Sequence, residues 1–496
     1  MKNMIPILLT IEQVKITTGN KQHKDFIITY NHYKTMKKTF LIACVALTSF
    51  CTFAQESKTE TEYRRSSLYT LMITDANITG DFGEIVKSTF DSIPIPDKYN
   101  DHCLETRFVN IDGITISDED IAAVREDSGK KGGKKKFGGM MKKGLSSVAS
   151  TATSGVVKMG ADEDSVAAKL LKHLNTNHVG NQLLAKWYGM SEELKDGSHF
   201  NYDLIAERGL QSASREKMAA AESVKGGINK IMDNAAADLI PRTFVMISSY
   251  SYVSAEDIIN MVTQAANTTG SMLGGKAGAI TSLASSAGGA VLSQILKGYF
   301  VKTTSYLFQL DCTPEQLSEF EQKYWTSQDL TEFMNSDDYK LKYVGKTWDY
   351  APATMKISTN SNDDKRLISR ATVRATDGAI SKLQKKYEAF RTLSTLHIDG
   401  ETMYAYIGKK EGVKSGDKFE VLEQEMDEDG NIKFNKVGTV KVMKNKVWDN
   451  RAGAGEIIEG SATGQEDDDI DTSLTYTILD GKAKKFMEGM LLRQEK

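Results

Sequence analysis

One stretch of the sequence nearly matches a phosphate-binding loop. In residues 270–277 (GSMLGGKA), glycines precede a lysine, the arrangement in which backbone amides and a Lys hold phosphates. Such a loop also needs a Ser or Thr hydroxyl for Mg²⁺, and Ala277 occupies that position. Residues 259–269 before it have a helical pattern instead of the required strand. We therefore interpret the match as a product of the Gly-rich composition.

Other catalytic and metal-binding patterns are equally incomplete. His173 and His178 are five residues apart, with no third ligand in a zincin-like pattern. Ser214 and Ser415 each begin an S-x-x-K match, which is short enough to arise by accident, and the sequence has no G-x-S-x-G motif. Acidic residues are too numerous for any pair to be singled out as general acid and base. The sequence therefore predicts a non-catalytic protein with no cofactor and no metal.

Two acidic stretches and one Trp-containing motif could bind ions or partners. Residues 427–431 and 466–471 lack the twelve-residue loop of a calcium site, so we interpret them as a hairpin tip and an acidic loop. The motif at 448–451 is more specific, because a Trp beside polar side chains can mark a binding face. The alternative is a Trp packed at the edge of a sheet, with an internal ion pair. The candidate interaction residues are Trp448, Asp449, Asn450 and Arg451.

Two further segments could contact a membrane. A lysine-rich stretch within 129–144 would gain roughly 1 kcal/mol per Lys near an anionic surface, although such runs are commonly solvated loops. Residues 277–296 are uncharged and long enough to span a bilayer, but their Ser, Thr and Gly content favours a small-residue helical hairpin or a loop. The candidate membrane-surface residues are Lys134, Lys135, Lys136, Phe137, Lys142 and Lys143.

An export signal is the clearest functional feature of the sequence. Met36 is followed by two lysines, an apolar run at 40–47 and a T-x-A site, which predicts a signal peptide over 36–54 with cleavage between Ala54 and Gln55. We interpret residues 1–35 as a start-site artefact. A lipoprotein anchored at Cys51 is disfavoured, because bulky Phe50 precedes the cysteine. The expected location is the periplasm or the outer membrane, with a soluble mature chain.

Cleavage would leave two cysteines in the mature chain. Cys103 and Cys312 could form a disulfide in an oxidising compartment, or they could be buried thiols. The sequence leaves both interpretations open.

Length and composition predict a globular protein of two or three domains. The 496 residues are 40% hydrophobic and 26% charged, and the net charge of −3 gives no basic field for nucleic acid. We predict an α+β fold with an α/β region at 66–392, low-complexity insertions at about 129–160 and 265–297, and a small β-barrel at 393–496. In the α/β region we expect strands at 67–73, 106–111, 200–205, 243–253, 300–310 and 339–350. Helices are expected at 82–90, 118–125, 162–188, 212–240 and 367–391, with a further helix that begins at Pro314. In the barrel we expect strands at 403–407, 418–426, 432–434, 438–443 and 473–479.

The C-terminal region resembles a known module. In residues 407–421, Gly412 and Gly416 are placed for two tight turns and Asp417 for a cap before the strand that follows. This stretch resembles the SH3-like barrel at the C-terminus of the flagellar T-ring protein, and the resemblance implies an assembly module over about the last hundred residues.

A second resemblance covers the whole mature chain. It is similar to a group of uncharacterised exported proteins of Gram-negative bacteria through residues 94–102, 204–209, 242–245 and 447–451. The strand–helix–strand pattern at 200–253 also resembles, faintly, the α/β domain of the curli secretion channel family.

Taken with the absence of catalytic motifs, these features predict an exported, non-catalytic cell-envelope protein. Its expected partner is another envelope protein or a second copy of itself. The alternative is a membrane-associated secretion or pore-forming component that uses the Lys-rich and Gly/Ala-rich insertions. No nucleic acid is expected as a partner.

Overall fold

The chain divides into two units, Met1–Thr61 and Glu62–Lys496. A computed structural model describes parts of the second unit, namely residues 63–74, 78–127, 163–190, 202–214, 217–218, 235–254, 297–324, 330–355, 361–426, 432–454 and 473–495. The predicted signal peptide, its cleavage site at Ala54 and Gln55, and nearly all of both insertions lie outside these residues. The domain boundary at 393 stays a prediction.

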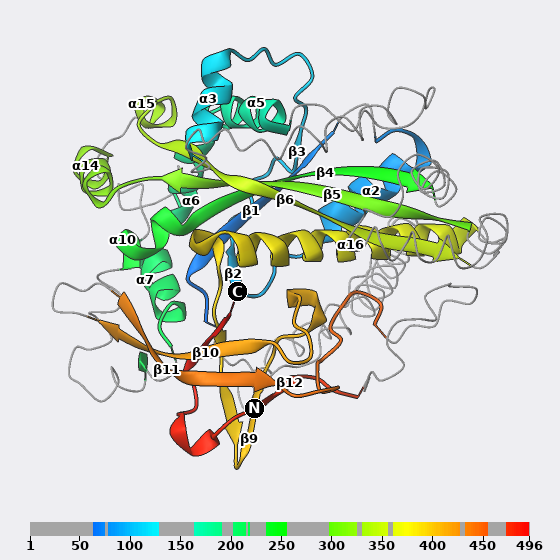
Figure 1. The fold of residues 1–496 in the computed structure, drawn as a ribbon. Coiled ribbons are helices and arrows are strands. Elements are labelled where there is room, and N and C mark those ends of the chain that lie inside the picture. Colours follow the sequence, from blue (N-terminus) through cyan, green and yellow to red (C-terminus); the bar gives the residue numbers. More distant parts are fainter. Residues whose placement is uncertain are drawn as a thin grey trace, which may run out of the picture. The chain divides into compact units, whose positions relative to one another are not determined.

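A six-stranded mixed sheet forms the centre of the α/β region (Figure 1). Its order is β2-β1-β4-β5-β6, and β3 also pairs with β1. The strand β1 is parallel to β2, β3 and β4, whereas β4, β5 and β6 are antiparallel to one another. The bounds are β1 Ser66–Ile73, β2 Tyr99–Asp101, β3 Phe108–Val109, β4 Thr243–Ser254, β5 Lys297–Asp311 and β6 Lys340–Met355. Five of the six expected strands are therefore confirmed.

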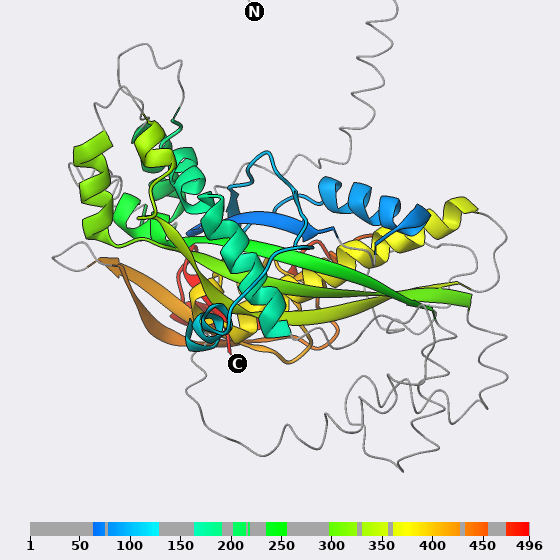
Figure 2. The same cartoon turned by 90° about the horizontal axis from the view of Figure 1, so that it is seen from above.

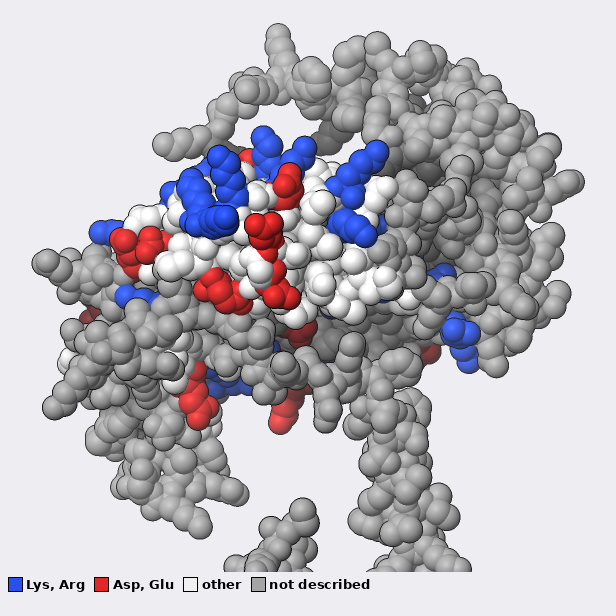
Figure 3. All heavy atoms as spheres, turned by 90° about the horizontal axis from the view of Figure 1, so that it is seen from below, with Lys and Arg blue, Asp and Glu red and all other residues white. Residues whose placement is uncertain are grey.

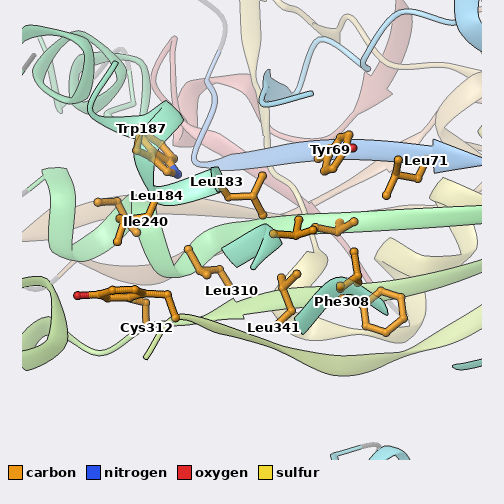
Figure 4. Packing of buried hydrophobic residues seen from close by; sticks show 14 of the residues in the cluster. Tyr69, Leu71, Leu183, Leu184, Trp187, Ile240, Phe308, Leu310, Cys312 and Leu341 are labelled. Carbon is orange, nitrogen blue, oxygen red and sulfur yellow. The ribbon is translucent and has the colours of Figure 1, made fainter. Parts of the chain in front are cut away.

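Helices cover both faces of this sheet, because the long strands are apolar on both sides (Figures 1 and 2). On one face, Tyr69 and Leu71 of β1 pack with Trp187 and Leu183 in the largest cluster, part of which is drawn in Figure 4. On the other face, Met72 packs against two further helices, α2 and α16. The first layer includes α3 Asp118–Asp127, α5 Glu163–Thr176, α6 Val179–Trp187, α7 Tyr202–Gln211, α10 Ala235–Leu239, α14 Pro314–Tyr324 and α15 Thr331–Met334, and the second contains α2 Gly80–Ser92 and α16 Ser361–Lys386.

Two predicted helix starts are confirmed by their capping bonds. The Ser117 hydroxyl accepts a hydrogen bond from the Asp120 amide at 3.2 Å, and the Asp120 carboxylate accepts one from the Ser117 amide at 2.9 Å. Thr313 and Gln316 form the same reciprocal pair before α14. Both pairs satisfy amides that the first helical turn leaves without partners.

The single helix predicted over 162–188 is wrong, because the chain breaks between α5 and α6. His178 has a left-handed backbone with φ of 49°. Asn175, near the end of α5, bonds both the amide and the carbonyl of Leu341 on β6, so this turn is fixed against the sheet. Just after the break, a Cβ on Gly180 would lie 2.0 Å from the Tyr339 carbonyl oxygen. Only a glycine allows α6 to pack so closely.

The strand predicted at 200–205 is also wrong, since this segment belongs to α7. Ile205, Gly209 and Ser212 are buried at the spacing of one helical face. Burial along one helical face therefore outweighs the strand preference of the aromatic and branched residues in this segment. In the helix predicted over 212–240, residues 215–216 and 219–234 lie outside the described part, and the described end consists of α10 and the short 3-10 helix η1 Ile240–Arg242.

The C-terminal region is a seven-stranded antiparallel sheet that is barrel-like, with the order β7-β13-β10-β11-β12-β9-β8. The predicted segments 432–434 and 438–443 form one strand, whose pairing shifts at Val437 through a bulge. Gly412 and Gly416 have φ of 71° and 85°, which confirms both predicted turns. The bounds are β7 Ser394–Thr395, β8 His397–Asp399, β9 Thr402–Ala405, β10 Lys418–Met426, β11 Ile432–Val442, β12 Thr477–Asp480 and β13 Leu491–Gln494.

Candidate functional site

The predicted interaction motif, Trp448, Asp449, Asn450 and Arg451, lies where the barrel-like sheet contacts α16. The Asp449 side chain is 7% exposed and accepts bonds from Arg451 Nε at 2.8 Å and Nη2 at 2.6 Å. Burial raises the pKa of Asp449, but Arg451 outweighs it and holds this pKa below its usual range. The ion pair that the sequence offered as the alternative is therefore present.

Asn450 is engaged with the short 3-10 helix η3, Lys409–Glu411. Its Oδ1 accepts from the Lys410 amide at 2.8 Å, and its Nδ2 donates to Glu411 Oε2 at 2.8 Å. A Cβ on Gly408 would lie 2.3 Å from the Trp448 carbonyl oxygen, so the two segments touch through backbone. The polar groups of the motif thus hold the barrel-like sheet together, and its role in binding stays a prediction.

A buried carboxyl lies on the α16 side of this junction. Asp377 is 7% exposed, and its Oδ2 has no hydrogen-bond partner among the described residues. Burial raises the pKa of Asp377 to about 7, against the attraction of Lys410 and with a smaller contribution from Glu411. A carboxyl in this state changes charge near neutral pH.

Three tyrosines and a histidine gather on the outer face of the barrel-like sheet. Tyr404 and Tyr406 point outward on either side of buried Ala405, at the end of β9. The ring centroid of Tyr404 lies 4.5 Å from that of Tyr476 and 5.7 Å from that of Tyr406. His397 of β8 stacks on Tyr404 at 5.2 Å. Such contacts hold aromatic rings in fixed orientations at the surface.

Apolar side chains extend this surface toward β11. Met443 bonds to Ile478 of β12, which places Met443 in the same cross-strand row as Tyr404. Tyr406 is 49% exposed and Met443 is 42% exposed. We call Tyr404, Tyr406, Tyr476, Ile478 and Met443 the tyrosine face.

Charged residues border the tyrosine face. Asp399 and Asp480 are exposed and lie in the cross-strand row two residues along the strands from the row that contains Tyr404. Lys441 lies opposite Asp480 on the neighbouring strand. In the view from below, the described surface has basic side chains along one margin and acidic ones nearer its middle (Figure 3). An aromatic centre with a charged border is typical of a protein-binding surface.

The sequence analysis did not find the tyrosine face. The alternation of Tyr404 and Tyr406 along a strand is its one local signal, because alternate residues share a face. Tyr476 comes from a distant segment and joins them only through the pairing of β12 with β9.

Three of the segments named for the predicted resemblance, 94–102, 204–209 and 242–245, meet around His102. This side chain is fully buried, with Nε2 2.8 Å from the Leu183 carbonyl oxygen and Nδ1 3.1 Å from Arg208 Nη1. Arg208 lies 4.3 Å above the ring of Trp187, whose Nε1 donates to Thr243 Oγ1 at 2.7 Å. Burial, aided by Arg208, lowers the pKa of His102 to about 3, so the imidazole is neutral. With both nitrogens occupied, His102 positions neighbouring segments and is not available for proton transfer.

Both described cysteines are free thiols, so the disulfide that the sequence left open is not present in this structure. Cys103 Sγ lies 3.8 Å from Thr70 Oγ1. Burial raises the pKa of Cys103, and it raises the pKa of Cys312 to about 12. Neither thiol is therefore activated as a thiolate.

Other predicted sites lie partly or wholly outside the described residues. The membrane-surface residues Lys134, Lys135, Lys136, Phe137, Lys142 and Lys143 fall within the part that is not described. Where the chain is described, no helix has the length and apolar character needed to cross a membrane. Within the same residues, no three His, Cys, Asp or Glu side chains come together as metal ligands.

No protein-family model matches the chain, and no curated protein matches it either.

Proposed function

We propose that this chain is an exported, non-catalytic cell-envelope protein that binds a second, different envelope protein through the tyrosine face. The observation that carries the proposal is the aromatic cluster of Tyr404, Tyr406 and Tyr476, in which Tyr406 is exposed and the other two are partly exposed. Tyrosine supplies a large contact area with few rotatable bonds and is enriched among residues that dominate binding energy. We further propose that the barrel-like sheet is an SH3-like assembly module.

The edge of the sheet indicates how the partner docks. The strand β8 lies at the end of the strand order, where a partner strand could add. However, the Ile398 amide already donates to the carboxylate of Glu488, which also bonds His397 Nδ1 at 3.0 Å. Strand addition is therefore opposed at β8, which is the edge beside Tyr404, and we place the contact on the tyrosine face. The partner presents an apolar segment that covers Tyr406 and Met443.

Site-specific photo-crosslinking tests this proposal. A photoreactive phenylalanine analogue at position 406 or 476 should give the same adduct of defined mass in envelope extracts. The control position is Trp348, an aromatic residue of the six-stranded sheet that is 46% exposed, and it should not give this adduct.

The purified partner then allows a quantitative measurement. Replacing Tyr406 and Tyr476 together by Ser should weaken binding about thirtyfold, which corresponds to the roughly 2 kcal/mol typical of a dominant interface residue. Unchanged affinity would contradict the assignment of the tyrosine face. An adduct of twice the chain mass would identify a second copy as the occupant and refute the choice of a different protein.

A further inference from the structure

A cavity of about 510 Å³ lies between the six-stranded sheet and the barrel-like sheet. Its walls come from the start of β1, from α10 and η1, from the segment after the short 3-10 helix η2 Glu388–Phe390, and from β11 and β13. Its lining includes five cationic side chains, Arg65, Lys98, Arg242, Arg391 and Arg493. Two carboxylates, those of Asp238 and Glu388, also line it.

These two carboxylates do not neutralise the cavity. Asp238 is shared, since it accepts from Arg65 at 2.9 and 2.5 Å and lies 3.6 Å from Arg242 Nε. Glu388 lies 3.1 Å from Arg391 but is 61% exposed, so water screens the pair. Arg493 is already paired, because its Nε donates to Glu420 Oε2 at 2.8 Å. The other four cations therefore face only two acidic groups.

Three polar groups of residues that line the cavity make no hydrogen bond to a described residue, although Arg242 Nε lies 3.6 Å from Asp238. The Tyr63 hydroxyl, Arg242 Nε and Arg391 Nη2 are buried without a hydrogen bond to any described residue. They are three of the nine buried side-chain atoms in that condition within the described part of the chain. Tyr63 is only 5% exposed. Such groups in a native protein call for an explanation, and each of the three is a hydrogen-bond donor.

We propose that this cavity binds a small organic anion whose oxyanion head group, a carboxylate or a phosphate, accepts hydrogen bonds from Tyr63, Arg242 and Arg391. The guanidinium group offers planar, paired donors that match both kinds of oxyanion. The volume lies within the range of small-molecule sites and exceeds the need of an inorganic ion. Phe434 and Leu393 supply an apolar wall for the body of the ligand.

Calorimetric titration of the full chain tests the proposal with four probes: phenyl phosphate, benzoate, inorganic phosphate and neutral benzyl alcohol. We expect at least one aryl anion to bind, more tightly than inorganic phosphate, with an affinity that falls as salt rises. Tighter binding of phenyl phosphate assigns a phosphate head group, and tighter binding of benzoate assigns a carboxylate. Benzyl alcohol should not bind.

Two variants identify the donors. Tyr63→Phe removes only a hydroxyl that has no hydrogen-bond partner among the described residues, so the variant should fold at least as stably as the original chain. This variant should nevertheless bind the aryl anion about tenfold more weakly than the original chain. Arg242→Gln should weaken it by at least the same factor. The matched control is Arg366→Gln, an exposed position on α16 outside the cavity, and it should leave binding unchanged.

Three results would overturn the proposal. They are no binding of either aryl anion, full binding by both Tyr63→Phe and Arg242→Gln, and binding of inorganic phosphate as tight as that of the better aryl anion. Tyr406→Ser should not alter anion binding, because Tyr406 does not line the cavity. The outcome is thus separate from that of the protein-binding proposal.

Discussion

Replacing Asp377 by Asn should stabilise the protein above neutral pH. The pKa of this carboxyl rises from 3.8 to about 7 on folding, mainly because burial disfavours its charged form. Below about pH 4 the carboxyl is neutral in both states, so its contribution to stability is fully present. As pH rises toward 7, the unfolded chain loses the proton first and the folded state becomes less stable. A rise of the pKa from 3.8 to about 7 corresponds to roughly 4 kcal/mol.

Urea denaturation of both proteins between pH 4.5 and 8 measures this effect. The stability gained by Asp377→Asn should be small at pH 4.5, grow through pH 7 and reach at most about 4 kcal/mol at pH 8. The control is Asp337→Asn, at an exposed position, whose effect should not change with pH in this way. A pH-independent difference between the original chain and Asp377→Asn would refute the assignment of a raised pKa.

Gly180→Ala should destabilise the chain in the same urea assay by about 1–3 kcal/mol, because the new Cβ would collide with the Tyr339 carbonyl. Sequencing the mature N-terminus should give Gln55, and any other start would contradict the predicted cleavage. For the lysine-rich stretch we expect weak or no flotation with anionic vesicles at low salt. Strong flotation that weakens as salt rises would instead support membrane contact, provided that a variant with five lysines replaced by Gln no longer floats. The five residues are Lys134, Lys135, Lys136, Lys142 and Lys143.

Elements with strong local signals could be predicted from the sequence. The long strands β4 and β5 have dense apolar runs, and α14 begins with a cap at Thr313 that depends only on its neighbours. The segment at 202–211 was missed because its apolar residues fit both a strand and a helix. The two-residue strand β7 offers no pattern, since it exists only through its pairing with β13.

The sites depend on contacts that no local pattern reports. The pairing of Asp449 with Arg451 was anticipated because the two residues are neighbours in sequence. In contrast, the tyrosine face requires the register of β9 against β12, and the cavity requires segments from both sheets. Tyr63 carries no chemical signal by itself. Its significance lies in a buried hydroxyl with no partner, which only the folded structure can reveal.

The helix α16 is held from two sides. Ala375, Ala379 and Leu383 are buried among the residues that pack on the six-stranded sheet. Its other side is bonded to the barrel-like sheet, where Ser381 Oγ donates to the Glu411 carbonyl oxygen at 3.0 Å and Lys385 Nζ to that of Gly412 at 2.8 Å.

This arrangement limits how the protein can be divided. A fragment that begins at residue 393 would keep every strand of the barrel-like sheet yet lose the bonds that support its turn at Glu411 and Gly412, whereas one that begins at 361 would keep them. Amide protons in the middle of α16 should therefore exchange with solvent only when the helix separates from both sheets, so the slowest exchange in the chain is expected there.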